Sequence, residues 1–125
     1  MTESSGKIAL VTGATGQDGA YLAHYLLGLG YRVTGTFRRT SSVNFWRIED
    51  LGISDHEHLD LVEHDVTDPS SCIRLVASCE PDEVYNLAAQ SSVAAVNNHP
   101  VEAVQANAIG PLLWLEALRQ SQSPA

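Results

Sequence analysis

The chain has 125 residues, 44% of them hydrophobic, and a formal net charge of −8 at pH 7. This length allows one domain with a moderate core. The acidic balance argues against nucleic acid or an anionic membrane as a partner, because either would require a basic face. No apolar run approaches the roughly 20 residues of a membrane span.

The two cysteines, Cys72 and Cys79, stand seven residues apart in a segment with helical spacing. Two helical turns place them roughly 10 Å apart along the axis, which is too far for a disulfide. The first seven residues, MTESSGK, are too polar for a signal peptide. Reduced cysteines and the absence of a leader favour a cytoplasmic protein.

The first third of the chain predicts a strand, a helix and a second strand. Residues 8–11 form a short, fully apolar run, which is typical of a buried parallel strand. Apolar residues then recur at helical spacing over residues 21–29. Residues 31–37 are rich in β-branched and aromatic side chains, which favours a strand.

The middle of the chain is less regular. Residues 38–58 have no clear period, except for a short helix expected at residues 45–51. Residues 59–63 predict the third strand. Asp68 and Pro69 then have the residue types of a helix cap and a first helical position.

In the helix that begins there, we expect Ile73, Val76 and Ala77 to face the core. Residues 82–87 predict a fourth strand, and residues 100–120 a long final helix. Strands that alternate with helices predict an α/β fold. The simplest topology is a Rossmann-type doubly wound parallel sheet, incomplete at about four strands with flanking helices, in the strand order 3-2-1-4.

Three glycines separate the first predicted strand from the first helix, at positions 13, 16 and 19. This arrangement aims unpaired N–H groups and the positive end of a helix at one point, which suits a pyrophosphate. Gly13 allows the tight turn, Gly16 lets the backbone approach the phosphates, and Gly19 lets the helix pack closely on the sheet. The context favours a dinucleotide cofactor over a purely structural turn.

The end of the second strand bears on which dinucleotide binds. An NAD site expects an acid there, about 20 residues past the glycines, for the ribose hydroxyls. The sequence instead has Arg38 and Arg39, and Arg47 follows within ten residues. Arginine binds phosphate through charge-assisted hydrogen bonds, so the pattern favours NADP. A solvated loop is the alternative interpretation of this basic cluster.

Two further strand ends face the same crevice in such a sheet. Asp65, after the third strand, can accept a hydrogen bond from an adenine amino group or can be a turn residue. Residues 86–92, after the fourth strand, include small residues that would let a nicotinamide ring lie close to the backbone. His56, His58 and His64 lack the spacing of a helical metal site and have no cysteine among them, so we expect no metal.

Four stretches together carry a resemblance: TGATGQDGAYLAHYLL, RRTSS, HDVTD and YNLAAQSSV. They resemble the extended short-chain dehydrogenase/reductase family, and most closely its GDP-mannose 4,6-dehydratase branch. The pattern T-G-x-x-G-x-x-G marks only the wider family. T-G-x-x-G-Q-D-G followed by R-R-x-S-S is more specific to the branch. The resemblance runs from about residue 7 to residue 119.

The resemblance implies a site for NADP. By this resemblance, the pyrophosphate would be held by Gly13, Ala14, Thr15, Gly16, Gln17 and Asp18, and the adenosine phosphate by Phe37, Arg38, Arg39 and Thr40. Adenine would be flanked by Asp65 and Val66. The nicotinamide side would be lined by Leu87, Ala88, Ala89, Gln90 and Ser91. Two positions depart from the branch, which usually has His where Ser92 stands and Tyr where Glu102 stands.

The resemblance also implies a lyase whose substrate is a nucleotide sugar, GDP-mannose. NADP would take a hydride from C4, water would leave across C5 and C6, and the hydride would return to C6. The family's catalytic groups are a Ser or Thr and a Glu after a fifth strand, then a Tyr-x-x-x-Lys pair. Lys7 is the only lysine in this sequence and follows no tyrosine. We therefore assign no catalytic residue.

We interpret residues 1–125 as the N-terminal NADP-binding part, without the catalytic strand and helix or the C-terminal substrate region, and expect it to be inactive alone. Two other functions stay open: a non-catalytic NADP-binding sensor or docking module, and a related nucleotide-sugar reductase or epimerase. We expect Phe45 and Trp46 to be exposed, and exposed aromatic side chains beside arginines are the composition of an interface. In the branch, the loop at residues 38–58 reaches a neighbouring subunit, so the full-length protein is expected to be a homo-oligomer, a tetramer or a dimer. A mobile lid is the alternative.

Overall fold

A computed structural model describes residues 6–39 and 44–125. Its centre is one parallel sheet whose strands follow the order β3-β2-β1-β4. The strands are β1 (Ile8–Thr12), β2 (Arg32–Phe37), β3 (Leu59–Glu63) and β4 (Glu83–Asn86). The predicted fold class and strand order are therefore confirmed.

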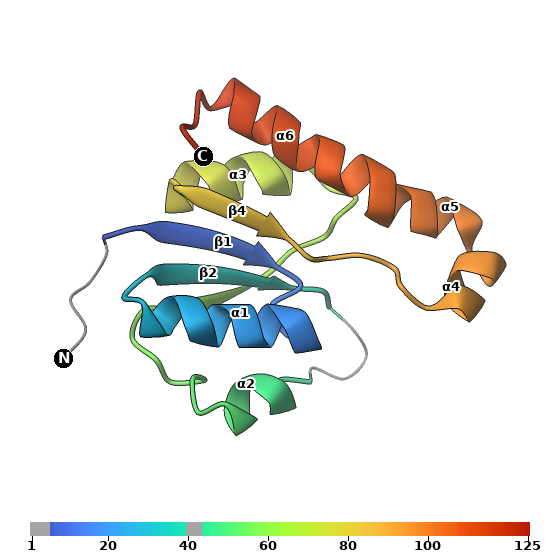
Figure 1. Ribbon diagram of the computed structural model, residues 1–125. Coiled ribbons are helices and arrows are strands. Elements are labelled where there is room, and N and C mark those ends of the chain that lie inside the picture. Colours follow the sequence, from blue (N-terminus) through green and yellow to red (C-terminus); the bar gives the residue numbers. More distant parts are fainter. Residues whose placement is uncertain (1–5, 40–43) are drawn as a thin grey trace.

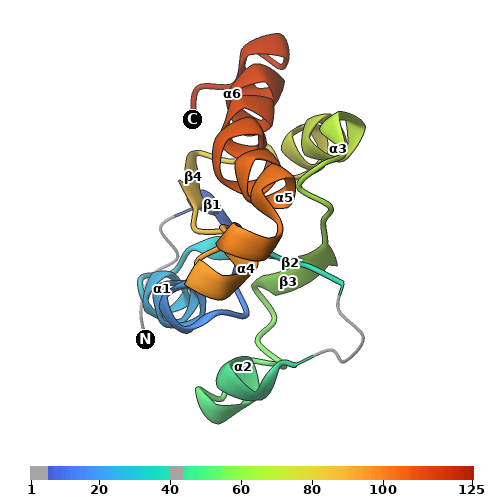
Figure 2. The ribbon, with the colours of Figure 1, turned by 90° about the vertical axis from the view of Figure 1, so that its right-hand side faces the viewer.

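Helices cover both faces of the sheet, as Figure 1 shows. They are α1 (Gln17–Gly28), α2 (Trp46–Asp50), α3 (Pro69–Cys79), α4 (Val93–Asn98), α5 (Pro100–Val104) and α6 (Gly110–Gln120), with a π-helical turn, η1 (Gln105–Ile109), between the last two. α1 and α2 lie on one face, and α3 and α6 pack together on the other (Figures 1 and 2). None of the helices in the described part of the chain has the length and hydropathy needed to cross a bilayer.

Each face of the sheet has its own core, because successive side chains of a strand point to opposite faces. Val11 and Val33 are buried on the α1 side, where Ile48 of α2 is also fully buried. Leu10 points to the other side and packs in a cluster with Trp114 of α6. Burial of Ile48 on this face stabilises α2, the short helix that we expected at residues 45–51.

Our expectation for the inward face of α3 is confirmed for Val76 and wrong for Ile73 and Ala77. The side chains that point inward are Cys72, Leu75 and Val76, whereas Ile73 is 38% exposed and Ala77 is exposed. The helix is rotated so that the spacing i, i+3, i+4 begins at Cys72 and brings the thiol into the core. Both cysteines are free, as predicted.

The long final helix is interrupted in a way that Pro111 explains. The turn before it is π-helical, and the Gly110 N–H donates to the carbonyl of Gln105, five residues back. Proline lacks an N–H and its ring collides with the carbonyl four residues earlier in a regular helix. A widened turn relieves that collision without ending the helix. The sequence pattern did not predict α4, in which the Ala95 N–H donates to the hydroxyl of Ser92 at 3.3 Å.

The close approach of α1 to the loop after β1 gives a stability prediction. A Cβ at Gly19 would lie 2.1 Å from the Gly13 carbonyl oxygen, whereas one at Gly28 of the same helix meets nothing within 4 Å. We expect Gly19→Ala to lower the free energy of unfolding by about 1–3 kcal/mol. Gly28→Ala is the matched control and should raise it by up to about 1 kcal/mol. Urea denaturation of both variants tests this, and equal effects would contradict the packing role of Gly19.

Candidate functional site

A cleft of about 270 Å³ opens at the carboxyl ends of the strands, the side of the sheet that Figure 2 faces. Residues that follow all four strands line it: Gly13, Thr15, Gly16, Thr36, Phe37, Arg38, His64, Val66, Leu87, Ala88, Ala89 and Ser91, with Ala106 from the π-helical turn. Ligands of open parallel sheets bind at this edge. The predicted stretches are thus brought together by the topology.

The glycine loop after β1 is held against both β2 and α1. Gly13 has φ +67°, a left-handed conformation that a residue with a side chain rarely adopts. The Ala14 N–H donates to the carbonyl of Thr36 at 2.9 Å, and the Gly16 N–H donates to the carbonyl of Gly13 at 3.1 Å. Gly35 of β2 leaves room for this contact, because a Cβ there would lie 2.7 Å from the Cβ of Ala14.

The start of α1 has the features of an anion site. Gly16 is the residue before the helix, and no side chain caps the first turn. The N–H groups of that turn therefore stay available for a ligand, and the helix dipole makes this end positive. A phosphate group at this point would accept hydrogen bonds from these N–H groups.

A second set of bonds fixes the loop after β4. The Thr12 hydroxyl donates to Asn86 Oδ1 at 2.6 Å and accepts from the Ala88 N–H at 3.0 Å. The side-chain amide of Asn107 forms two hydrogen bonds with the backbone of Gln90. Its Oδ1 accepts from the Gln90 N–H at 2.8 Å, and its Nδ2 donates to the Gln90 carbonyl at 3.0 Å. The small residues of this loop therefore have a defined position at the cleft.

The arginines after β2 are placed differently from one another. Both Arg38 and Arg39 are exposed and form no ion pair with any described residue. Arg38 lines the cleft, whereas Arg39 is not among its lining residues. Thr40 lies outside the described residues.

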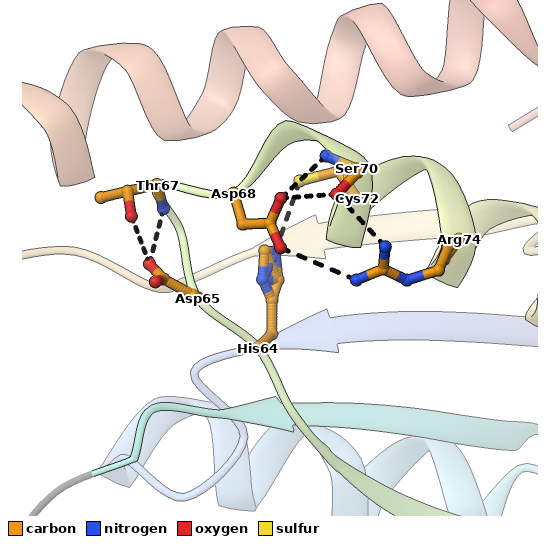
Figure 3. Close-up of polar contacts among 7 residues, drawn as sticks. All are labelled: His64, Asp65, Thr67, Asp68, Ser70, Cys72 and Arg74. Atoms are coloured by element: carbon orange, nitrogen blue, oxygen red, sulfur yellow. Dashed lines mark hydrogen bonds and ion pairs between the residues drawn. The ribbon is translucent and has the colours of Figure 1, made fainter.

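Asp65 forms a turn with its own neighbours (Figure 3). Its Oδ1 accepts from the hydroxyl of Thr67 at 2.6 Å and from the Thr67 N–H at 2.8 Å. These hydrogen bonds lower the pKa of Asp65 below its ordinary value, so it is ionised at neutral pH. One carboxylate oxygen of Asp65 therefore stabilises a turn, which is one of the two interpretations that we considered. That Asp65 accepts a hydrogen bond from an adenine amino group stays a prediction.

His64 is a residue of the cleft that we had weighed only as a metal ligand. It is 4% exposed, its ring centroid lies 4.7 Å from that of Trp114, and its Nε2 lies 3.3 Å from Cys72 Sγ (Figure 3). Burial lowers the pKa of His64, against the opposing charges of Asp65 and Asp68. Burial also raises the pKa of Cys72 to about 11, so this side chain is a thiol at neutral pH. The pair is a hydrogen bond between two neutral side chains, and it links the residue after β3 to α3.

Across residues 6–39 and 44–125, no three His, Cys, Asp or Glu side chains gather as metal ligands would. The glycine loop, Arg38 and the loop after β4 all line this one cleft. Six of the predicted residues that the structure describes do not line the cleft: Ala14, Gln17, Asp18, Arg39, Asp65 and Gln90. Sequence reasoning missed the supporting residues Thr12 and Asn107. Thr12 could have been found as the polar residue that ends an apolar strand, but Asn107 has no local signal.

The comparisons with known proteins agree with this geometry. Four parallel strands in this order, with a glycine loop after the first, define a Rossmann-type sheet. The family model described as GDP-mannose 4,6 dehydratase matches residues 10–125, so the chain belongs to that family.

Individual relatives give the same result. The chain is 49% identical over 116 residues to a GDP-mannose 4,6-dehydratase of Yersinia enterocolitica and 48% identical over 117 residues to GDP-mannose 4,6 dehydratase 2 of Arabidopsis thaliana. In both cases 90% of this chain and 31% of the relative are covered, so the chain spans about a third of their length. The UDP-glucose 4-epimerase of Thermus thermophilus in complex with NAD is a similar solved structure, with a TM-score of 0.77 at 26% identity over 93% of this chain and 35% of the epimerase.

Buried His64 gives a prediction for the pH dependence of stability. Because its pKa is lower in the folded chain than in the unfolded chain, the unfolded state binds more protons as the pH falls through about 6.5. Stability is then lost toward acid, by up to about 1.4 kcal/mol per pH unit. We expect His64→Gln to reduce this slope between pH 7.5 and 5.5, and the exposed His24→Gln control to keep it. Urea denaturation at each pH measures the slopes, and equal slopes in all three proteins would exclude His64 as the cause.

Proposed function

We propose that residues 1–125 form the N-terminal NADP-binding part of a GDP-mannose 4,6-dehydratase, a lyase. The observation that carries this proposal is the cleft, in which the glycine loop, Arg38 and the loop after β4 meet in a chain of this family. The relatives of highest identity reported above are named GDP-mannose 4,6-dehydratases. That identity favours a dehydratase over an epimerase, since the epimerase structure is only 26% identical.

The residues of the cleft fit a nicotinamide dinucleotide. The loop from Gly13 to Gly16 would hold the pyrophosphate, because it leads into the first turn of α1, which no side chain caps. Arg38 would bind the phosphate of an NADP ribose. Leu87 to Ser91 would lie along the nicotinamide side, where Ala88 and Ala89 present little side-chain bulk. NADP, when bound, would supply a nicotinamide ring that can accept a hydride and return it.

The part of this chain in the reaction is to bind and orient the cofactor. Thr12 and Asn107 would keep the loop after β4 in one conformation against the nicotinamide side. We assign the proton-transfer groups and the sugar-binding residues to a region beyond Ala125. We also propose that the full-length protein is cytoplasmic and acts on the nucleotide sugar as a homo-oligomer.

Residues 44–58 refine the oligomer proposal. Trp46 is 51% exposed and suits an interface. Phe45 does not, because it is half-buried and packs edge-to-face on Phe37 with ring centroids 5.0 Å apart. Our expectation that both aromatic side chains are exposed is therefore wrong for Phe45.

The activity test compares the full-length protein with two controls. With GDP-mannose and NADP, the full-length protein should form the 4-keto sugar product, and residues 1–125 alone should form none above a blank.

Gly16→Val in the full-length protein should weaken NADP binding by at least tenfold, because its side chain would occupy the space of the pyrophosphate. The fold should persist, since the nearest atom to a Cβ at this position is the Gly13 carbonyl oxygen at 3.4 Å. Product chromatography, calorimetry and circular dichroism give the three readouts. A full-length protein that binds NADP but leaves GDP-mannose unchanged would contradict the dehydratase, and an unfolded Gly16→Val variant would contradict the binding role of this glycine.

A further inference from the structure

A separate cleft of about 280 Å³ is lined by residues of α1 and α2, the two helices that lie on one face of the sheet (Figure 1). We call it the α1–α2 cleft. Among the described residues, none lines both this cleft and the main cleft. The dinucleotide site therefore does not explain the side chains that line the α1–α2 cleft.

Two aromatic side chains from different helices line this cleft. Tyr21 of α1 is 59% exposed, and Trp46 of α2 is 51% exposed. The apolar side chains of Ala20 and Leu51 also belong to the lining. Aromatic and apolar side chains around a concave surface, with a few polar groups among them, are typical of a small-molecule site.

The ring of Trp46 is held in place by Arg47. The guanidinium carbon of Arg47 lies 4.6 Å from the centroid of the indole, and its Nη1 donates to the carbonyl of Thr15 at 3.3 Å. These two contacts tie the indole to the loop at the start of α1. A guanidinium covers only one face of an indole, and about half of Trp46 stays exposed, so the ring still has surface to offer a ligand.

The polar side chains of the lining have unused hydrogen-bonding groups. The Asp50 carboxylate forms no ion pair with a described residue, and the amide of Gln17 and the hydroxyl of Tyr21 form no hydrogen bond with one. Arg47 keeps further N–H donors besides the one that bonds to Thr15. The lining thus presents both donors and acceptors, and its one arginine and one aspartate leave it with no net charge.

This chemistry matches an uncharged ring with hydroxyl groups at its edge. A hydroxyl both donates and accepts, so it can bond to a carboxylate and to a guanidinium. The C–H groups of a pyranose ring are slightly positive and pack on the negative face of an aromatic ring. A phosphorylated ligand fits less well, because the charge of Asp50 would repel it. The volume suits a single ring, since sites for drug-sized ligands measure roughly 300–1,000 Å³.

A neighbouring subunit is the other occupant that exposed Trp46 suggests. The core of a protein interface is depleted in charged residues, and aspartate is among those that are rare there. In this chain Asp50 lines the same cleft as Trp46. The lining therefore favours a hydroxylated ring over an interface core.

We propose that the α1–α2 cleft binds a hexopyranose that carries no phosphate, with Tyr21 and Trp46 packed on the sugar ring and Asp50 accepting hydrogen bonds from its hydroxyl groups. This inference goes beyond the proposed function, because it adds a second site that the dinucleotide and the reaction do not use. The hexose is either a free sugar or the end of a glycan.

Saturation-transfer NMR titrations of the full-length protein with the methyl pyranosides of mannose, glucose and galactose test the assignment. GDP is added to occupy the proposed substrate site. At least one pyranoside should bind with a Kd of about 1 mM, which is what a ligand of this size allows. Trp46→Ala and Tyr21→Ala should each weaken binding by about tenfold or more, because each removes an aromatic face. Tyr25→Ala is the matched control, since this tyrosine is 63% exposed one turn further along α1 and does not line the cleft.

A second pair of variants tests the hydrogen bonds. Asp50→Asn keeps the size of the side chain but removes its charge, so it should weaken the same pyranoside by about tenfold. Glu49→Gln removes a charge from an exposed residue of the same helix that does not line the cleft, and it should leave the Kd unchanged.

The proposal would be overturned if the wild-type protein bound none of the pyranosides at ten times the expected Kd, or if Tyr25→Ala lost as much binding as Trp46→Ala. Light scattering gives an independent readout, because a smaller oligomer mass for Trp46→Ala would assign the ring to a subunit interface instead. UDP-glucose that bound more tightly than methyl glucoside would contradict a ligand without phosphate. Tighter binding of mannobiose than of methyl mannoside would identify the end of a glycan, and equal binding a single sugar. A wild-type protein that forms the 4-keto product but binds no pyranoside contradicts this inference alone.

Discussion

The contact between the Gly13 carbonyl and the first turn of α1 is the constraint on which the arrangement of the cleft depends. A Cβ at Gly19 would lie 2.1 Å from that oxygen, so the helix can approach only because residue 19 has no side chain. The same loop bonds to β2 through the Ala14 N–H, and Gly35 leaves the room that this needs. Close packing of three backbones therefore aims the positive end of α1 at the carboxyl edge of the sheet.

Side chains complete what this backbone packing begins. Thr12 ties the end of β1 to the loop after β4, and Asn107 ties that loop to the long helix on the other face of the sheet. Polar side chains that bond to backbone in this way hold a loop without adding bulk to the cleft. The π-helical turn before Pro111 includes Asn107, so the irregularity of the helix and the position of the loop belong to one arrangement.

Although the chain is acidic overall, a positively charged side chain lines the main cleft. The arginine that lines the main cleft, Arg38, is not neutralised by a carboxylate in the described residues. Two exposed arginines on other elements, Arg74 and Arg119, each pair with an acid. Buried His64 stays neutral and packs between Trp114 and Cys72, so it adds no charge there.

Sequence alone determined the fold class and the strand order, and it pointed to the loops that line the cleft. Apolar strands, the glycine spacing and the Asp68-Pro69 cap are local patterns, and local patterns report on local conformation. Gly13 and Arg38 could be placed because strand ends in a parallel sheet meet at one edge. Only the tertiary structure decided which face of α3 is buried, that Phe45 packs inside its own chain, and that Arg47 rather than Arg39 lines a cleft together with Arg38. These depend on how helices rotate and settle against the sheet, through contacts between residues far apart in sequence that no short pattern encodes.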